Sequence, residues 1–217
     1  MGEEQYPDWP NWSTGILQQV ADALFALGAI KFGAFRLKLH EKNPDAPLSP
    51  IYVNLRLLRS CPDAMKGVVK IFRDMSRGLQ FDCYADVPTA ATPIVAVLSY
   101  LTHIPMITPR KAKTHGAPGT IDGAFREGQT ALLVDDLVTR ADSKLEAIQV
   151  LERNGVKVQD VMVLVDLEQG GRERLKEAGY RLHTASRLST LLRWYLNTGK
   201  IGQARYEEVM AYLAANK

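Results

Sequence analysis

Short apolar runs alternate along this chain with segments whose apolar residues recur every three or four positions. The runs lie near residues 81–87, 104–107, 131–134 and 161–165, and the periodic segments near 14–27, 62–77, 93–101, 143–153 and 171–178. Continuous apolar runs predict strands buried on both faces of a parallel sheet, and the periodic segments predict amphipathic helices. Their alternation predicts an α/β fold, with a doubly wound, mainly parallel sheet flanked by helices. A short extended piece near Leu182 and two C-terminal helices are expected to follow.

Length and composition indicate one globular domain. The chain has 217 residues, enough for one substantial core, and its 46% hydrophobic and 24% charged residues are typical of globular proteins. No run of 18 apolar residues occurs, so we expect no membrane partner. The first residues lack a basic region followed by an apolar one, so we expect no secretory leader and a cytoplasmic location.

Charge and cysteine content narrow the chemistry further. The net charge of +3 is too small to argue for a nucleic-acid partner. A nucleic-acid-binding module would draw only on one basic loop and a pI near 8.8, because no aromatic stacking platform or continuous basic face is visible. Cys61 and Cys83 lack the spacing of a metal or redox pair, so both are expected to be ordinary thiols.

The apolar run at 131–134 leads directly into two adjacent carboxylates, Asp135 and Asp136. We expect the strand to deliver them into a polar turn before a helix that begins with a capping box at 143–146 and stops at Asn154. Ligands collect at the carboxyl ends of parallel strands, which favours a functional site here. The alternative is that Asp136 and Asp142 only satisfy backbone amides at a turn.

A basic segment stands out within the long stretch 109–123, which shows no periodicity. It brings Arg110, Lys111, Lys113 and His115 within six residues, between glycines and prolines. Arginine grips phosphate through a planar fork and lysine as a point charge, so the mixture favours a polyphosphate ligand. The alternative is a solvated basic loop without a ligand.

A third segment, residues 85–93, places small residues and prolines between a predicted strand and a predicted helix. Small side chains let backbone amides approach an anion, and they serve close packing equally well.

In this order the segments resemble the type I phosphoribosyltransferases and, within them, the orotate phosphoribosyltransferases. Residues 35–38 are similar to the segment that carries a substrate-facing lysine, here Lys38, and residues 49–56, with Tyr52, to the segment beside the base. Residues 110–116 resemble the mobile catalytic loop, 133–139 the diphosphate-sugar signature and 166–171 a later family segment.

The resemblance implies transfer of phosphoribosyl from phosphoribosyl diphosphate to orotate, giving orotidine monophosphate and diphosphate in pyrimidine synthesis. It implies Mg²⁺ as cofactor, held by the acidic pair directly or through water while the pair holds the ribose hydroxyls. It also implies a homodimer in which the mobile loop serves the neighbouring site. The expected layout is a hood-like region at 1–60, an α/β core at 61–185 and C-terminal helices at 186–217.

The roles of the residues follow from the same resemblance and from the charge that develops in the reaction. Cations that close over the departing diphosphate stabilise a transition state in which its negative charge grows. Lys113 and His115, with Arg110 and Lys111, are expected in that role. The 5-phosphate is expected in the loop formed by Thr139, Arg140, Ala141, Asp142 and Ser143.

The chain departs from the family pattern at three of these positions. Ala141 stands where the family has glycine, in a turn that needs positive φ. Asp142 replaces a small hydroxyl residue and would repel phosphate unless Arg140 or Lys144 offsets it or it points away to cap the helix.

Leu167 stands where the family has an arginine that contacts orotate, which should weaken orotate binding unless Arg56, Lys38 or another cation substitutes. Two hypotheses follow. The chain is either a divergent orotate phosphoribosyltransferase or a paralogue that serves another base or binds nucleotides without catalysis.

Overall fold

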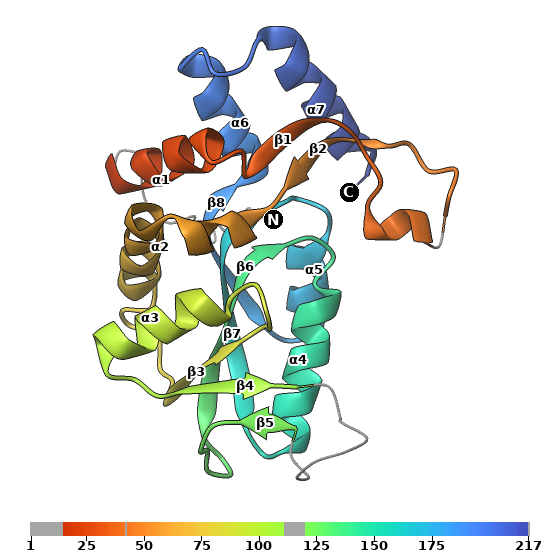
Figure 1. Cartoon of the computed structure of the whole chain (residues 1–217). Coiled ribbons are helices and arrows are strands. Elements are labelled where there is room, and N and C mark those ends of the chain that lie inside the picture. The colour runs from red at the N-terminus through yellow and green to blue at the C-terminus, as the bar shows by residue number, and fades with distance from the viewer. Residues whose placement is uncertain (1–14, 42, 111–119, 217) are drawn as a thin grey trace, which may run out of the picture.

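A computed structural model describes residues 15–41, 43–110 and 120–216, without the side chains of Lys38 and Leu39 (Figure 1). The strands are β1 (Ile30–Phe35), β2 (Ser49–Val53), β3 (Cys83–Asp86), β4 (Met106–Pro109), β5 (Ile121–Asp122), β6 (Thr130–Val138), β7 (Lys157–Asp166) and β8 (Arg181–Arg187). The α-helices are α1 (Gly15–Ala26), α2 (Pro62–Met75), α3 (Thr92–Thr102), α4 (Asp142–Arg153), α5 (Gly171–Glu177), α6 (Leu188–Asn197) and α7 (Gln203–Ala215). Two 3-10 helices are η1 (Lys38–Glu41) and η2 (Leu55–Ser60).

The central sheet has the order β5-β4-β3-β6-β7-β8, and its strands are parallel except for β5, which runs antiparallel to β4. The predicted α/β class with a mainly parallel sheet is therefore confirmed. The longest strands, β6 and β7, lie beside one another inside the sheet, and both are buried along most of their length. Such strands need apolar side chains on both faces, which explains the apolar runs in the sequence.

The two faces of the sheet carry separate cores. Leu132 and Val134 of β6 pack with α1, α2, α3 and α6, whereas Ala131 and Leu133 pack with α4 and α5. Figure 1 shows these helices on opposite sides of the sheet. Successive strand residues point to opposite faces, so one strand supplies both cores. Among the described residues, no helix has the length and apolarity needed to span a bilayer.

A small hood lies over the carboxyl ends of the central strands (Figure 1). It consists of the antiparallel pair β1 and β2, with η1 in their connection. The C-terminal helix α7 packs on β2 of the hood. The Tyr195 hydroxyl of α6 donates to the Ala21 carbonyl of α1 at 2.8 Å and joins the C-terminal part of the chain to the first helix. Both hood strands lie within residues 1–60, the range in which a hood-like region was expected.

Several elements extend beyond their sequence-based bounds. The strands β6, β7 and β8 are longer than predicted, because pairing with a neighbour keeps polar residues such as Asp166 and Arg187 extended. The two-residue strand β5 lies in the stretch that was expected to have no regular structure.

At the edge of the sheet, β8 is held by a charged cluster around Asp160 of β7. Both carboxylate oxygens of Asp160 accept hydrogen bonds from Arg181 at 2.8 Å, and His183 Nε2 lies 2.7 Å from Oδ1. Burial by itself would raise the pKa of the Asp160 carboxyl, but the hydrogen bonds and charges of His183 and Arg181 outweigh it and lower the pKa to about 2. The cluster therefore fixes the pairing of β7 with β8.

Replacing Asp160 by asparagine tests this. The folded-state pKa lies below the unfolded value, so the charged carboxylate stabilises the fold above about pH 4, and this contribution is lost as the pH falls toward 2. We expect Asp160→Asn to lower the free energy of unfolding by about 1 to 2 kcal/mol at pH 7. Guanidinium unfolding at pH 7 and at pH 3 measures it. If the free energies of unfolding of variant and wild type differ by the same amount at both pH values, the charged Asp160 carboxylate does not stabilise the fold in this way.

Candidate active site at the carboxyl edge of the sheet

Three loops meet where the parallel strands end: residues 87–91 after β3, 139–141 after β6 and 167–170 after β7. Backbone hydrogen bonds attach the first and third loops to β6, from the Val87 amide to the Val134 carbonyl at 3.1 Å and from the Leu167 amide to the Val138 carbonyl at 2.9 Å. Gly171 brings α5 against the middle loop, since a Cβ at this position would lie 2.3 Å from the Thr139 carbonyl oxygen. Only glycine permits that approach, so the loop after β6 is supported from two sides.

A cavity of about 410 Å³ lies between the hood and the loops after β6 and β7. From the hood it is lined by Leu37, Ser49, Ile51, Tyr52 and Val53, from β6 and α4 by Leu137, Thr139, Arg140, Asp142 and Glu146, and from β7 onward by Leu167, Gln169 and Leu188. One side is mainly apolar and the other carries charge and hydroxyl groups. Such a mixture suits a ligand with a flat apolar part and an anionic part.

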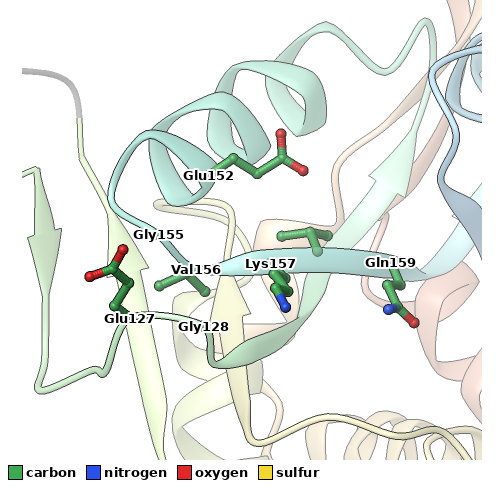
Figure 2. A pocket seen from close by; sticks show the side chains of 8 residues that line it. Glu127, Gly128, Glu152, Gly155, Val156, Lys157 and Gln159 are labelled. Atoms are coloured by element: carbon green, nitrogen blue, oxygen red, sulfur yellow. The ribbon is translucent and has the colours of Figure 1, made fainter.

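A second hollow, of about 530 Å³, lies at the opposite edge of the sheet (Figure 2). It is bordered by Glu127, Glu152 and Lys157, beside the amino ends of β6 and β7. In α/β sheets ligands bind at the carboxyl ends of the strands, so this hollow is not the site. Its carboxylates also do not converge, because Glu127 and Glu152 stand apart in Figure 2 and Tyr180 donates to Glu152.

The acidic pair lies within β6 and not in a turn. The strand continues through Leu137 and Val138, which pair with Val165 and Asp166 of β7. The expectation that the strand ends before the carboxylates was therefore wrong, because two further apolar residues keep the chain in the sheet. The polar turn consists of the next three residues, 139–141.

Asp135 points toward α4 and forms a buried ion pair with Lys144. Lys144 Nζ lies 2.5 Å from Oδ2, and both side chains are 4% exposed. Oδ1 accepts the Asp136 amide at 2.8 Å, and Lys144 also donates to the Leu137 carbonyl. Burial raises the pKa of the Asp135 carboxyl; the Lys144 ammonium opposes this rise, and the Asp136 carboxylate adds to it. Both oxygens of Asp135 are thus engaged within the protein.

Asp136 is the member of the pair whose carboxylate is less engaged within the protein, although its side chain is buried and does not line the cavity. Its Oδ1 accepts the Leu137 amide at 2.8 Å, and among the described residues no side chain forms a hydrogen bond or ion pair with this carboxylate. Nowhere in the described part of the chain do three His, Cys, Asp or Glu side chains form a metal-binding group. A magnesium ion at Asp136 would therefore take at most one or two oxygens from this carboxylate and its other ligands from substrate and water.

The turn after β6 has the backbone conformation that the family comparison led us to expect. Ala141 adopts φ 62° and ψ 9°, in the left-handed region, and is buried. An alanine there costs about 1 to 2 kcal/mol relative to the right-handed conformation, so the surrounding contacts must stabilise this shape. The predicted capping box is wrong, because Ala141 is the N-cap, Ser143 lies inside the first turn and no side chain caps the helix.

Asp142 is the first residue of α4, and its carboxylate pairs with Arg174 of α5. The same guanidinium donates to the Arg140 carbonyl at 3.0 Å. The sequence had suggested Arg140, Lys144 or a capping role as partners for Asp142. Lys144 is instead committed to Asp135, and Arg174 had no sequence signal because it lies 32 residues away in another element.

The remaining predicted residues lie in different places. Lys111, Lys113 and His115 fall outside the described residues. The side chain of Lys38 is not described, and its backbone begins η1. Arg110 does not line the cavity; its Nε lies 2.8 Å from Asp122 Oδ2, although the N–H is not aligned for a hydrogen bond.

The loop after β3 rests on a buried carboxylate that sequence reasoning did not single out. Asp86 is fully buried and accepts hydrogen bonds from the hydroxyls of Thr92 and Thr108. Arg59 of η2 donates to the Thr89 carbonyl, which ties this loop to the segment that follows the hood strands. The loop also contains a cis peptide bond between Pro88 and Thr89.

Replacing Lys144 by methionine tests the buried pair. The change leaves the carboxylate of Asp135 without its cation, which costs about 3 to 5 kcal/mol of unfolding free energy. We expect the double variant Lys144→Met with Asp135→Asn to recover a large part of that loss. Lys70→Met, at an exposed position of α2, is the control, and chemical denaturation is the measurement. If Lys144→Met lowers the free energy of unfolding no more than Lys70→Met does, the pair of Asp135 and Lys144 does not hold β6 to α4.

Comparison with known proteins places this site in a family. No model of a known protein family matches the sequence. The chain is 35% identical over 193 residues to the orotate phosphoribosyltransferase of Pyrobaculum aerophilum, covering 88% of this chain and 96% of the relative. It is 34% identical over 204 residues to the uridine 5'-monophosphate synthase of Bos taurus, covering 93% of this chain but 41% of that longer protein.

The solved structure of Leishmania donovani UMP synthase superimposes with a TM-score of 0.82 at 31% identity, over 93% of this chain and 42% of that chain. The chain thus spans less than half of the UMP synthases and nearly the whole of the Pyrobaculum protein. Similarity of this extent and identity shows common descent, and the chain belongs to the orotate phosphoribosyltransferase family.

Proposed function

We propose that this chain transfers phosphoribosyl from phosphoribosyl diphosphate to orotate, giving orotidine monophosphate and diphosphate. The observation that carries the proposal is the cavity in which the amino end of α4, with Thr139 and Arg140, faces the hood segment around Tyr52. An anionic sugar phosphate fits the polar side and a flat base the apolar side. The family to which the chain belongs supports the same reaction.

The amino end of α4 suits the 5-phosphate. The first amides of a helix have no partner within the helix, and its dipole favours negative charge at this end. No side chain caps α4, so these amides remain available to the ligand. Thr139 and Arg140 line the cavity beside them and add a hydroxyl and a guanidinium.

Asp136 is proposed to hold the ribose, either directly at the hydroxyls or through Mg²⁺. The ion supplies positive charge to the departing diphosphate when it is bound. Asp135 contributes indirectly, because its ion pair with Lys144 fixes the strand that carries Asp136. As the bond between the sugar and the diphosphate breaks, positive charge develops on the sugar, and a carboxylate beside the sugar would stabilise that charge.

The loop cations Lys113 and His115, with Lys111, are proposed to stabilise the leaving diphosphate. The loop is rooted where the Arg110 amide donates to the Thr120 carbonyl, and Asn154 at the end of α4 donates to the Thr120 hydroxyl at 2.8 Å. Asp142, at the other end of this 12-residue helix, lines the cavity. The two ends of α4 are about 18 Å apart, so the loop is attached beside the end of this helix that lies away from the cavity.

We propose the homodimer that the family resemblance implies, in which each loop serves the partner's site. A suitable contact surface exists on α3, where Val97, Tyr100 and Leu101 lie on one exposed face at helical spacing. Tyr100 is 79% exposed. Grouped large apolar side chains on a surface mark contact sites, so we assign this face of α3 to the dimer interface.

A second candidate function is favoured by Leu167. Its side chain lines the cavity beside Leu137 and Leu188, where a cation would be needed to pair with the carboxylate of orotate. Arg56 does not line the cavity. A base without a carboxylate, such as uracil, would meet no unpaired group on this apolar side.

An activity assay with Mg²⁺, phosphoribosyl diphosphate and either orotate or uracil tests both functions. We expect orotidine monophosphate from the wild-type chain, and a loss of about 100-fold in kcat/KM for Asp136→Asn, because that carboxylate is proposed to act on the reacting sugar. Asp74→Asn, at the C-terminal end of α2, is the matched control and should have the kcat/KM of wild type. Turnover of uracil in place of orotate would establish the second candidate, and turnover of neither base would exclude both.

The dimer has its own test. We expect Tyr100→Glu to convert the dimer to a monomer in sedimentation experiments and to lower activity, because a buried unpaired charge opposes association. Gln149→Glu adds the same charge at an exposed position of α4 and should leave the dimer intact. A wild-type chain that is monomeric and fully active would refute the shared-loop arrangement.

A further inference from the structure

One arginine on α5 makes two contacts with the loop that precedes α4. The Arg174 guanidinium forms an ion pair with the Asp142 carboxylate and donates to the Arg140 carbonyl at 3.0 Å. Both side chains of the ion pair are about half exposed, 48% for Arg174 and 54% for Asp142. An exposed pair of this kind contributes little to folding stability, so its position matters more than its strength.

The position is beside the proposed phosphate cradle. Asp142 lines the cavity, and its own amide belongs to the uncapped first turn of α4. Glu146, one turn further along, lines the cavity as well. Two carboxylates at the mouth of an anion site repel an approaching phosphate, and the repulsion grows where solvent is partly excluded.

The two other described cations of this turn do not pair with Asp142. Lys144 is buried against Asp135 and the Leu137 carbonyl. Arg140 lines the cavity, where its guanidinium is available to an anion. Within the described part of the chain, Arg174 alone pairs with the Asp142 carboxylate.

We propose that Arg174 is a positioning residue that neutralises Asp142 and fixes the Arg140 carbonyl, so that the loop accepts the 5-phosphate despite the carboxylate at its edge. The inference rests on the proposed function, because it needs a sugar phosphate in the cavity. Arg174 itself does not line the cavity, so it acts through its two partners. Asp142 stands where the family has a small residue, and the positive charge of Arg174 then balances the negative charge that this difference introduces.

A double-mutant cycle on Arg174 and Asp142 separates charge neutralisation from simple support of the loop. We expect Arg174→Gln to weaken binding of phosphoribosyl diphosphate and of ribose 5-phosphate about tenfold, equal to about 1.4 kcal/mol. Binding of inorganic diphosphate, which lacks the 5-phosphate, should stay unchanged. Asp142→Asn should tighten both sugar phosphates, and in that background Arg174→Gln should cost less than about twofold.

Calorimetric titration with Mg²⁺ measures these affinities, and Arg174→Lys, which keeps the charge, should lie within about threefold of wild type. Arg77→Gln, which removes an exposed arginine paired with Asp74, is the control and should bind as wild type does. Thermal unfolding of each variant confirms that it is folded, and the kinetic readout is a rise in KM for phosphoribosyl diphosphate with kcat nearly unchanged.

The outcomes distinguish the inference from the function on which it rests. If Arg174→Gln weakens sugar-phosphate binding equally with and without Asp142→Asn, Arg174 only supports the loop. If Arg174→Gln weakens binding of inorganic diphosphate as much as binding of the sugar phosphates, the effect is not at the 5-phosphate. Either result overturns the inference while the function stands. If wild type binds neither phosphoribosyl diphosphate nor diphosphate, the proposed function fails and the inference fails with it.

Discussion

The buried ion pair between Asp135 and Lys144 is the interaction on which the site depends. It joins the carboxyl end of β6 to the first turn of α4, directly across the turn at 139–141. Removing either partner would leave an uncompensated charge in the core, so the strand and the helix are held at a defined distance. Lys144 also binds the Leu137 carbonyl, which is part of the strand just before the turn. The loop that faces the cavity is therefore fixed at both of its ends.

The same loop is supported from outside by α5. Gly171 allows the start of that helix to touch the Thr139 carbonyl, and Arg174 reaches the Arg140 carbonyl and Asp142. These contacts explain how Ala141 persists in a left-handed conformation that an L residue rarely adopts. A strained residue survives where its surroundings determine its geometry, and such residues gather at functional sites. Here the strained turn is the one that begins the helix facing the cavity.

The sequence predicted the architecture well, because apolar runs and helical periodicity report burial, which the sheet and its helices impose on every residue. It also placed the acidic pair and the loop after it at the correct edge. It did not predict that Asp135 faces α4 and Asp136 faces the other side, since this follows from continuation of β6 through Leu137 and Val138. It could not find Arg174 as the partner of Asp142, because the contact joins two helices across a sheet edge and leaves no local pattern. The capping box failed for a related reason: Ser143 has a cap-like spacing, but the turn shape is set by tertiary contacts at Ala141.

The departures from the family pattern are not equivalent in physical terms. On the phosphate side, the unusual carboxylate of Asp142 has a guanidinium partner, and the unusual alanine sits in the conformation that glycine would take. The turn therefore keeps its shape and its charge is partly balanced, as the proposed anion site requires. On the base side, Leu167 faces other apolar side chains of the cavity. This change weakens the binding of a ligand that carries a carboxylate, and it does not lower the stability of the fold. Under the proposed function, Leu167 and the hood would therefore discriminate between bases, while the turn between β6 and α4 would bind the sugar phosphate.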